Sequence, residues 1–219
     1  MVRMNVYVQA GLISLIILAG GMFSIKYMDD QRLKVISKDI ESMKTEIEDS
    51  KLFILYSQTL GDNSTLLCHA LKTQIDQRIE KNQQLIFNLQ KYEAANVFGE
   101  EYYSLKTYFI VKNLELWLYF TKYKKLCDTQ QVSILYFYPD KTACPECEVQ
   151  ANILTSLRNA CKNVKVFALP ANIDIGLINV LKDRYNVTKT PTIVVNEYAK
   201  FEGITTEYNL HTIIECSSS

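Results

Sequence analysis

The stretch that decides the fold is Val132-Ser133-Ile134-Leu135-Tyr136-Phe137-Tyr138, which leads shortly into Cys144-Pro145-Glu146-Cys147. The first run is apolar apart from one serine, and it predicts a buried β-strand. After the second cysteine, apolar residues return at three- and four-residue spacing, which is typical of a helix. Two cysteines three positions apart on one helical turn lie about 5–6 Å apart at Cβ, close enough to form a disulfide. The sequence therefore predicts a dithiol at the start of a helix that follows a strand.

The residue types of this motif suit thiol–disulfide exchange. Cys144 would lie at or just before the helix start, where unpaired N–H groups and the helix macrodipole favour a thiolate. Pro145 has no N–H and is suited to an early helical position. Cys147, one turn further in, would resolve the mixed disulfide that Cys144 forms by attack. Thiol–disulfide chemistry is therefore the leading hypothesis.

Composition limits the other classes of function. The chain has 219 residues, enough for one large domain or two small ones. Lys plus Arg equals Asp plus Glu at 24 each, and basic residues do not alternate with aromatic ones, so we expect no nucleic-acid partner. Glycine is sparse and no glycine-rich phosphate loop is present, which argues against nucleotide chemistry.

The amino-terminal segment predicts a membrane anchor over residues 1–26. Residues 6–25 carry no charge, and about 20 apolar residues are enough to span a bilayer. A cleaved signal peptide is the alternative, but no small-residue cleavage site follows the run. Lysine and arginine after the run would by themselves place the long carboxyl-terminal part in the cytoplasm, whereas the cysteines favour an oxidising compartment. We expect the extracytoplasmic side, because large domains translocate largely regardless of charge.

Residues 27–128 predict a helical domain. They contain no proline, which permits long helices. A turn over 96–99 separates a helix over 65–95 from a helix over 100–127, and the many aromatic residues of the second helix predict a hairpin core. Before the hairpin, a heptad-like seam could pair two copies of the chain; it consists of Leu33, Ile36, Ile40, Met43, Ile47 and Ile54.

Two cysteines support the hairpin. Cys68 lies 29 residues before Val97 in the turn, and Cys127 lies 30 residues after it. Two antiparallel helices of equal rise would bring these thiols together at the end away from the turn, although such spacing also arises by chance. A disulfide between them would indicate an oxidising compartment.

Residues 129–219 change period and predict an α/β domain. Further strands are expected over 164–169, 192–195 and 198–202, and helices over 148–162, 175–185 and 207–216. Strands that alternate with helices, followed by a hairpin and a final helix, predict a mixed sheet with helices packed against it.

This order resembles the thioredoxin superfamily over about residues 129–216. Lys189-Thr190-Pro191-Thr192 stands just before the third strand, where that family keeps a cis-proline facing its dithiol. The resemblance implies that the Thr190 backbone binds an extended client segment and that Pro191 packs against the active disulfide. Tyr136 replaces the family's buried acid, and Glu146 between the cysteines should make the pair a milder oxidant, or a reductant, than relatives with histidine there.

The same family topology places Cys161 and Cys216 at neighbouring helix ends, which predicts a structural disulfide. A zinc site made from these two residues with Cys144 and Cys147 is rejected, because a helix length would separate the two pairs. His69 and His211 are interpreted as surface residues without carboxylate partners. No metal and no cofactor are expected.

We therefore predict a membrane-anchored, extracytoplasmic thiol–disulfide oxidoreductase that acts on client protein thiols or disulfides. A membrane redox partner and a homodimer through the helical segment are further expectations. The alternative is a non-catalytic scaffold that keeps a thioredoxin-like fold and binds partners through its helical domain. The sequence leaves the redox direction and the clients open.

Overall fold

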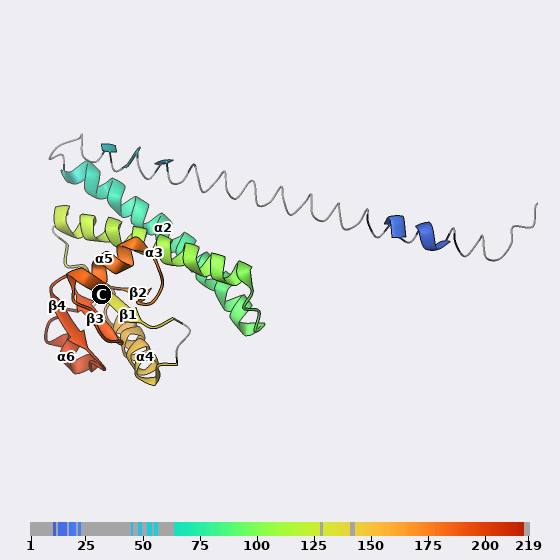
Figure 1. Cartoon of the computed structure of the whole chain (residues 1–219). Coiled ribbons are helices and arrows are strands. Elements are labelled where there is room, and N and C mark those ends of the chain that lie inside the picture. Colours follow the sequence, from blue (N-terminus) through green and yellow to red (C-terminus); the bar gives the residue numbers. More distant parts are fainter. Residues whose placement is uncertain are drawn as a thin grey trace, which may run out of the picture. The chain divides into compact units, whose positions relative to one another are not determined.

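The computed structural model describes residues 11, 13–16, 18–20, 22, 45, 48–49, 52–53, 55–56, 64–127, 129–140 and 143–216 (Figure 1). The chain divides into two compact units, Met1–Asp62 and Asn63–Ser219. In the first unit, the described residues are helical and mostly exposed. Among all described residues, no helix is both long and apolar enough to cross a bilayer. Most of the anchor predicted over 1–26 and of the seam over 33–54 lies outside the described residues.

The second unit begins with a helical hairpin made of α2 (Ser64–Ala94) and α3 (Glu100–Leu126). Asn96 takes a positive φ of 52° in the turn between them, a conformation that asparagine tolerates better than most residues. The Cys68–Cys127 disulfide, with Cα atoms 5.7 Å apart, joins the two helices at the end away from this turn. This is the pairing expected from the spacing of the two cysteines. The hairpin core contains Leu67, Leu71, Ile75, Leu89, Ile110, Leu114, Trp117 and Phe120.

A four-stranded mixed sheet follows the hairpin, in the order β2-β1-β3-β4. The central strand β1 (Val132–Tyr138) is parallel to β2 (Val164–Pro170) and antiparallel to β3 (Thr192–Val195), and β3 is antiparallel to β4 (Ala199–Glu202). Six consecutive residues of β1 are buried, which explains why its sequence is nearly continuously apolar rather than alternating.

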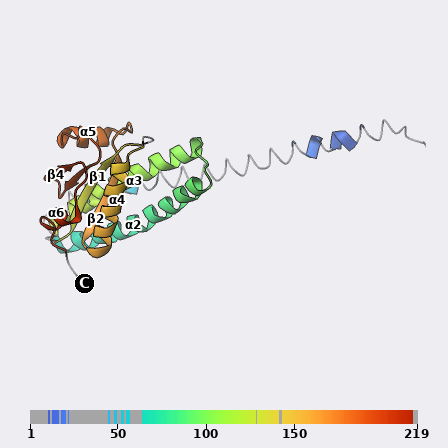
Figure 2. The same cartoon turned by 90° about the horizontal axis from the view of Figure 1, so that it is seen from below.

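Helices cover both faces of the sheet (Figures 1 and 2). On one face, α4 (Pro145–Ala160) and α6 (Glu207–His211) share a core with the strands, which contains Ile134, Tyr136, Leu154, Leu157, Val164, Ile193 and Leu210. Phe167 of β2 is buried and lies 5.7 Å, between ring centroids, from Phe120 of α3. Helix α5 (Gly176–Arg184) buries Ile178 and Leu181.

The hairpin and the α/β layer belong to one compact unit from Asn63 onward. The domain boundary after residue 128 stays a prediction. Besides the Phe120–Phe167 contact, the Asn113 amide donates a hydrogen bond to the Ala168 carbonyl at 3.1 Å. This bond satisfies a main-chain oxygen of β2, which pairs with a strand on one side only.

The last helix is shorter than predicted. The apolar spacing predicts a helix over 207–216, but α6 ends at His211. The β-branched run that follows, Thr212-Ile213-Ile214, disfavours helix continuation, and Ile214 instead turns into the core with 3% exposure. The Asn163 amide donates a hydrogen bond to the Glu215 carbonyl at 2.8 Å. This tertiary contact takes the place of a further helical turn.

Candidate redox-active site

The Cys144–Cys147 pair opens α4. Cys144 is the N-cap residue, Pro145 occupies the first helical turn, and the Cys147 N–H donates to Cys144 Sγ at 3.2 Å. The two cysteines form a disulfide with Cα atoms 5.2 Å apart. A sulfur that accepts a main-chain N–H at a helix start would be favoured as a thiolate after reduction, because both the donor and the macrodipole stabilise negative charge.

The two sulfur-bearing residues differ in exposure. Cys147 is 6% exposed and belongs to the core under α4, whereas Cys144 is only half-buried. Glu146 between them is exposed. An incoming thiol or disulfide therefore has access to Cys144 before Cys147, which is the order that attack and resolution require.

The peptide bond between Thr190 and Pro191 is cis, as the resemblance to the thioredoxin superfamily implies. Thr192 pairs with Phe137 in the antiparallel register of β1 and β3. Pro191 therefore lies at the carboxyl end of β1, from which the chain leads into the dithiol. Thr190 is half-buried and Pro191 is buried.

Tyr136 connects β1 to the dithiol. Its hydroxyl donates a 2.7 Å hydrogen bond to the Cys147 carbonyl, and the residue is 5% exposed. Burial raises the pKa of Tyr136 to about 12, so the hydroxyl stays protonated at neutral pH. The position where the family keeps an acid thus holds a neutral donor that fixes the first turn of α4. Glu148, the acidic residue directly after the motif, is exposed.

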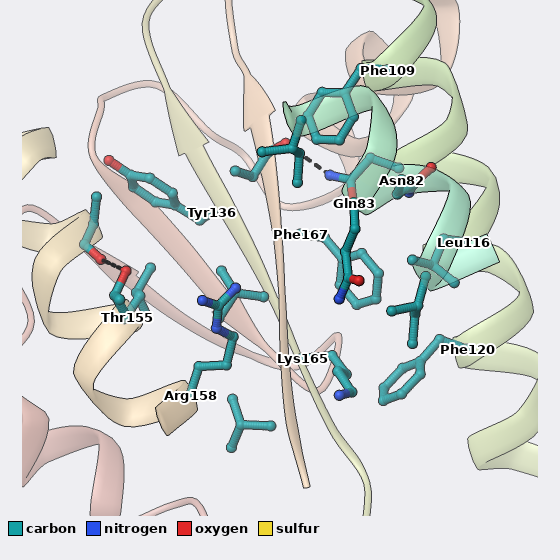
Figure 3. Close-up of a pocket in the computed structure, with 18 of the residues that line it drawn as sticks. Asn82, Gln83, Phe109, Leu116, Phe120, Tyr136, Thr155, Arg158, Lys165 and Phe167 are labelled. Atoms are coloured by element: carbon teal, nitrogen blue, oxygen red, sulfur yellow. Dashed lines mark hydrogen bonds between the residues drawn. The ribbon is translucent and has the colours of Figure 1, made fainter. Parts of the chain in front are cut away.

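A groove of about 580 Å³ runs behind this site, between the hairpin, β2 and α4 (Figure 3). Tyr136 lines the groove and also contacts the dithiol turn. Phe109 and Phe120 face it from the hairpin, so some aromatic residues of α3 line this groove as well as the hairpin core. Residues of α2, α3, β1, α4 and β2 together form the groove, so no local pattern indicated it.

The remaining cysteines pair as expected. Cys161 and Cys216 form a disulfide with Cα atoms 4.9 Å apart. Cys144 caps the start of α4 and Cys161 caps its end. The length of the helix therefore separates the Cys144–Cys147 pair from the Cys161–Cys216 pair, and the four cysteines do not form one zinc site. Ligand atoms of Cys161, His211 and Cys216 lie within 4.8 Å of one another, but two sulfurs bonded to each other offer no thiolate to a metal.

The prediction that His211 lacks a carboxylate partner is wrong. His211 Nε2 lies 3.6 Å from Glu207 Oε1, and His211 Nδ1 lies 3.4 Å from Cys216 Sγ. Glu207 stands four residues before His211, so the sequence carried a signal in the i,i+4 spacing.

The chain was compared with known protein families, curated proteins and solved structures. Residues 131–215 match the family model described as "Thioredoxin domain". Solved structures that resemble the chain include oxidised thioredoxin O2 from Arabidopsis thaliana, 18% identical, covering 40% of this chain and 79% of that one, with a TM-score of 0.34. Oxidised mitochondrial thioredoxin 3 from Saccharomyces cerevisiae is 21% identical, with coverages of 43% and 87% and a TM-score of 0.33. No curated protein matches the chain. The family-model match shows a thioredoxin-superfamily domain over residues 131–215, somewhat more than a third of the chain.

Proposed function

Because residues 131–215 form a thioredoxin-superfamily domain, we propose that the protein is a thiol–disulfide oxidoreductase whose reacting pair is Cys144 and Cys147. The observation that carries the proposal is the arrangement of this pair. The pair lies at the start of α4, with Cys144 as the N-cap and Cys147 in the first turn. Cys147 is buried, so only the N-cap cysteine is accessible to a client. A bond made only to hold the fold together would not need one sulfur at the surface beside a helix N-terminus.

The exchange proceeds in two steps. In the reductive direction, the Cys144 thiolate attacks one sulfur of a client disulfide, a Cys144–client disulfide forms, and the other client sulfur leaves as a thiolate. Cys147 then attacks Cys144 Sγ, which closes the Cys144–Cys147 bond and releases the first client sulfur. The client gains two electrons and the dithiol loses two; the reverse sequence forms a disulfide in the client.

Neighbouring residues position the client and tune the pair. An extended client segment would pair with the Thr190 backbone and lie against Pro191, next to the end of β1. Glu146 is exposed next to both sulfurs, and its carboxylate disfavours a thiolate more than a histidine would. This supports a mild oxidant or a reductant. Tyr136 holds the main chain of Cys147 and supplies no base.

The other segments of the chain suggest a cellular setting for this reaction. Residues 1–26 would anchor the chain in a membrane, and the disulfides would place residues 129–219 on the extracytoplasmic side. A membrane redox partner would then recycle the dithiol. The seam over 33–54 would join two chains, which would suit isomerisation because two sites could hold one misfolded client.

Trapping tests the proposed reaction. A full-length Cys147→Ala variant cannot resolve its mixed disulfide, so it should accumulate a covalent adduct with a disulfide-bonded protein such as insulin. A Cys144→Ala variant is the matched control and should trap far less, because Cys147 is buried. The non-catalytic alternative predicts the same low adduct level for both variants, and that result would overturn the proposal.

A further inference from the structure

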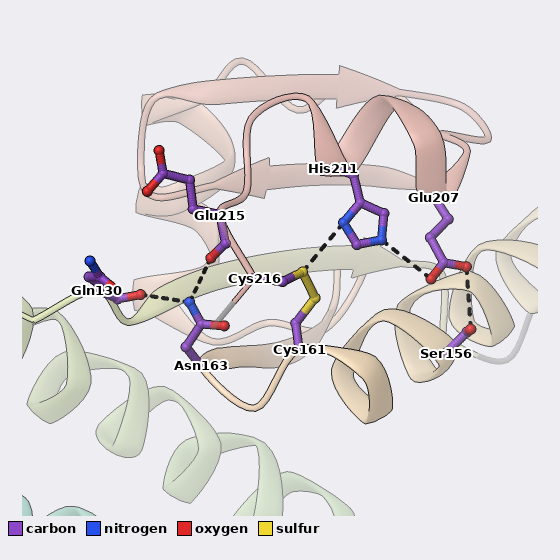
Figure 4. The surroundings of a disulfide bond; sticks show 8 residues. All are labelled: Gln130, Ser156, Cys161, Asn163, Glu207, His211, Glu215 and Cys216. Atoms are coloured by element: carbon purple, nitrogen blue, oxygen red, sulfur yellow. Dashed lines mark hydrogen bonds and ion pairs between the residues drawn. A yellow bond between two sulfur atoms is a disulfide. The ribbon is translucent and has the colours of Figure 1, made fainter. Parts of the chain in front are cut away.

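The Cys161–Cys216 disulfide at the far end of α4 has a polar environment that a purely structural bond does not need (Figure 4). Nδ1 of His211 lies 3.4 Å from Cys216 Sγ. On the other side of the ring, Nε2 lies 3.6 Å from Glu207 Oε1. The Ser156 hydroxyl donates to the second oxygen of that carboxylate at 3.3 Å. Carboxylate, imidazole and sulfur therefore follow one another in a row.

The order of Glu207, His211 and Cys216 decides which nitrogen of the imidazole faces the sulfur. The carboxylate of Glu207 favours a proton on Nε2 of His211, and Nδ1 is then the nitrogen that faces the sulfur. If the disulfide is reduced, Nδ1 can take the proton of the Cys216 thiol. The product is a thiolate beside an imidazolium that a carboxylate stabilises from behind, which is the usual way to activate a nucleophilic cysteine.

The two sulfur-bearing residues are also unequally accessible. Cys161 is fully buried, with 0% exposure, whereas Cys216 is half-buried and close to the surface histidine. An external thiolate can therefore reach the Cys216 sulfur, and Cys161 is the leaving group. The same asymmetry distinguishes Cys144 from Cys147 at the other end of the helix.

Contacts other than the disulfide also hold the segment that leads to Cys216. The Asn163 amide donates to the carbonyl oxygens of Glu215 and Gln130, each at 2.8 Å. Leu210 and Ile214 are 0% and 3% exposed in the core under α4. These contacts hold the segment that precedes Cys216 when the disulfide opens, so opening need not unfold the domain.

We infer that Cys161 and Cys216 form a second thiol–disulfide exchange centre, in which Cys216 is the exchanging sulfur and His211, held by Glu207, stabilises its thiolate. This centre is separate from the Cys144–Cys147 function proposed above. A thiolate RS⁻ attacks Cys216 Sγ, the Cys161–Cys216 bond breaks, and Cys161 leaves as a thiolate and takes a proton from solvent. A second RS⁻ attacks the mixed disulfide, RSSR leaves, and Cys216 remains as a thiolate. Two thiols are oxidised and one protein disulfide is reduced.

Glutathione is a suitable probe, because it is a small thiol that can reach a half-buried sulfur. The full chain with Cys144→Ser and Cys147→Ser retains two disulfides, Cys161–Cys216 and Cys68–Cys127, and the second serves as an internal reference. The variant is equilibrated with mixtures of reduced and oxidised glutathione, alkylated, and analysed by mass spectrometry for each cysteine. We expect Cys161–Cys216 to be reduced at a more oxidising buffer ratio than Cys68–Cys127.

Replacement of the histidine tests the thiolate contact. In the same background, His211→Ala should lower the equilibrium constant for reduction of Cys161–Cys216 about fivefold, or about 20 mV for a two-electron couple. His69→Ala, at the only other histidine, is the matched control and should leave the constant unchanged. Circular dichroism of the reduced protein checks that the fold is retained. The inference is overturned if Cys161–Cys216 resists reduction as strongly as Cys68–Cys127, if reduction unfolds the domain, or if His211→Ala has no effect.

Discussion

At its amino-terminal end, α4 carries a disulfide between residues 3 apart on one helical turn; at its carboxyl-terminal end, the disulfide joins residues 55 apart in sequence. At the first end, the helix start itself supplies the N–H donor to sulfur. At the second end, α6 supplies a histidine instead. In both pairs one cysteine is in the core and its partner is accessible, which is the arrangement that directional exchange requires.

The two disulfides differ in how far each depends on tertiary structure. Cys144 and Cys147 need only a strand, a helix start and a proline, all of which are local. Cys216 needs α6 to end at His211 and the following residues to fold back over Asn163. The amino-terminal pair should therefore tolerate perturbation of α6, whereas the carboxyl-terminal pair should not.

The largest expected effect concerns the amino-terminal pair. Cys144→Ser removes the attacking sulfur, and we expect the rate of insulin reduction by the full chain to fall at least about a thousandfold. Asn152→Ala, on the exposed side of the same helix, is the control and should keep the rate within a factor of about two. If Cys144→Ser retained most of the activity, the amino-terminal pair would not be the reacting pair.

Local patterns predicted much of this architecture because the strands and hairpin helices are long apolar segments with clear breaks between them. The cis bond before Pro191 and the position of Tyr136 followed from the resemblance to one superfamily. The contact between His211 and Cys216 could not be predicted, because it depends on where α6 stops. The groove at Tyr136 combines residues from the hairpin, β2 and α4, and such a combination exists only after folding.

A core substitution in α4 tests whether the disulfides at both ends of this helix depend on its packing against the sheet. Leu157 is fully buried in the core that α4 shares with the sheet, so Leu157→Ala should cost about 3 kcal/mol of unfolding free energy through lost burial and a cavity. Chemical denaturation measures this loss. Val149→Ala on the same helix, where the side chain is 45% exposed, should cost much less. Equal losses would mean that α4 is not packed as described.

Glu146 sharpens the comparison by changing charge only at the amino-terminal end. Glu146→His should make reduction of Cys144–Cys147 about tenfold more favourable, or about 30 mV, because a thiolate is more stable beside a histidine than beside a carboxylate. Equilibration with glutathione followed by mass spectrometry reports each pair separately. The Cys161–Cys216 pair is the internal control and should not shift; a lower or unchanged potential at Cys144–Cys147 would contradict this role of Glu146.

Tyr136 should have the smallest effect at neutral pH. Tyr136→Phe removes the hydrogen bond to the Cys147 carbonyl and should cost about 1 kcal/mol of unfolding free energy. Burial raises the pKa of Tyr136 from its ordinary value of about 10 to about 12, so its stabilising contribution is complete below pH 10. Above pH 10 the unfolded tyrosine loses its proton while the folded one keeps it, and stability falls as the pH approaches 12.

Denaturation at several pH values between 9 and 12 checks this window. The variant should lose stability less steeply than the wild type over that range. Tyr198→Phe is the matched control, because Tyr198 is 72% exposed, and it should follow the wild-type curve. Identical slopes for Tyr136→Phe and the wild type would show that Tyr136 titrates as an ordinary tyrosine.

The measurement that tests the account most directly is limited alkylation of the reduced, folded full chain, with the rate followed at each cysteine by mass spectrometry. At both ends of α4 one sulfur should react well before its partner: Cys144 before Cys147, and Cys216 before Cys161. If Cys147 reacted as fast as Cys144, the account of an accessible attacking sulfur backed by a buried resolving sulfur would be contradicted.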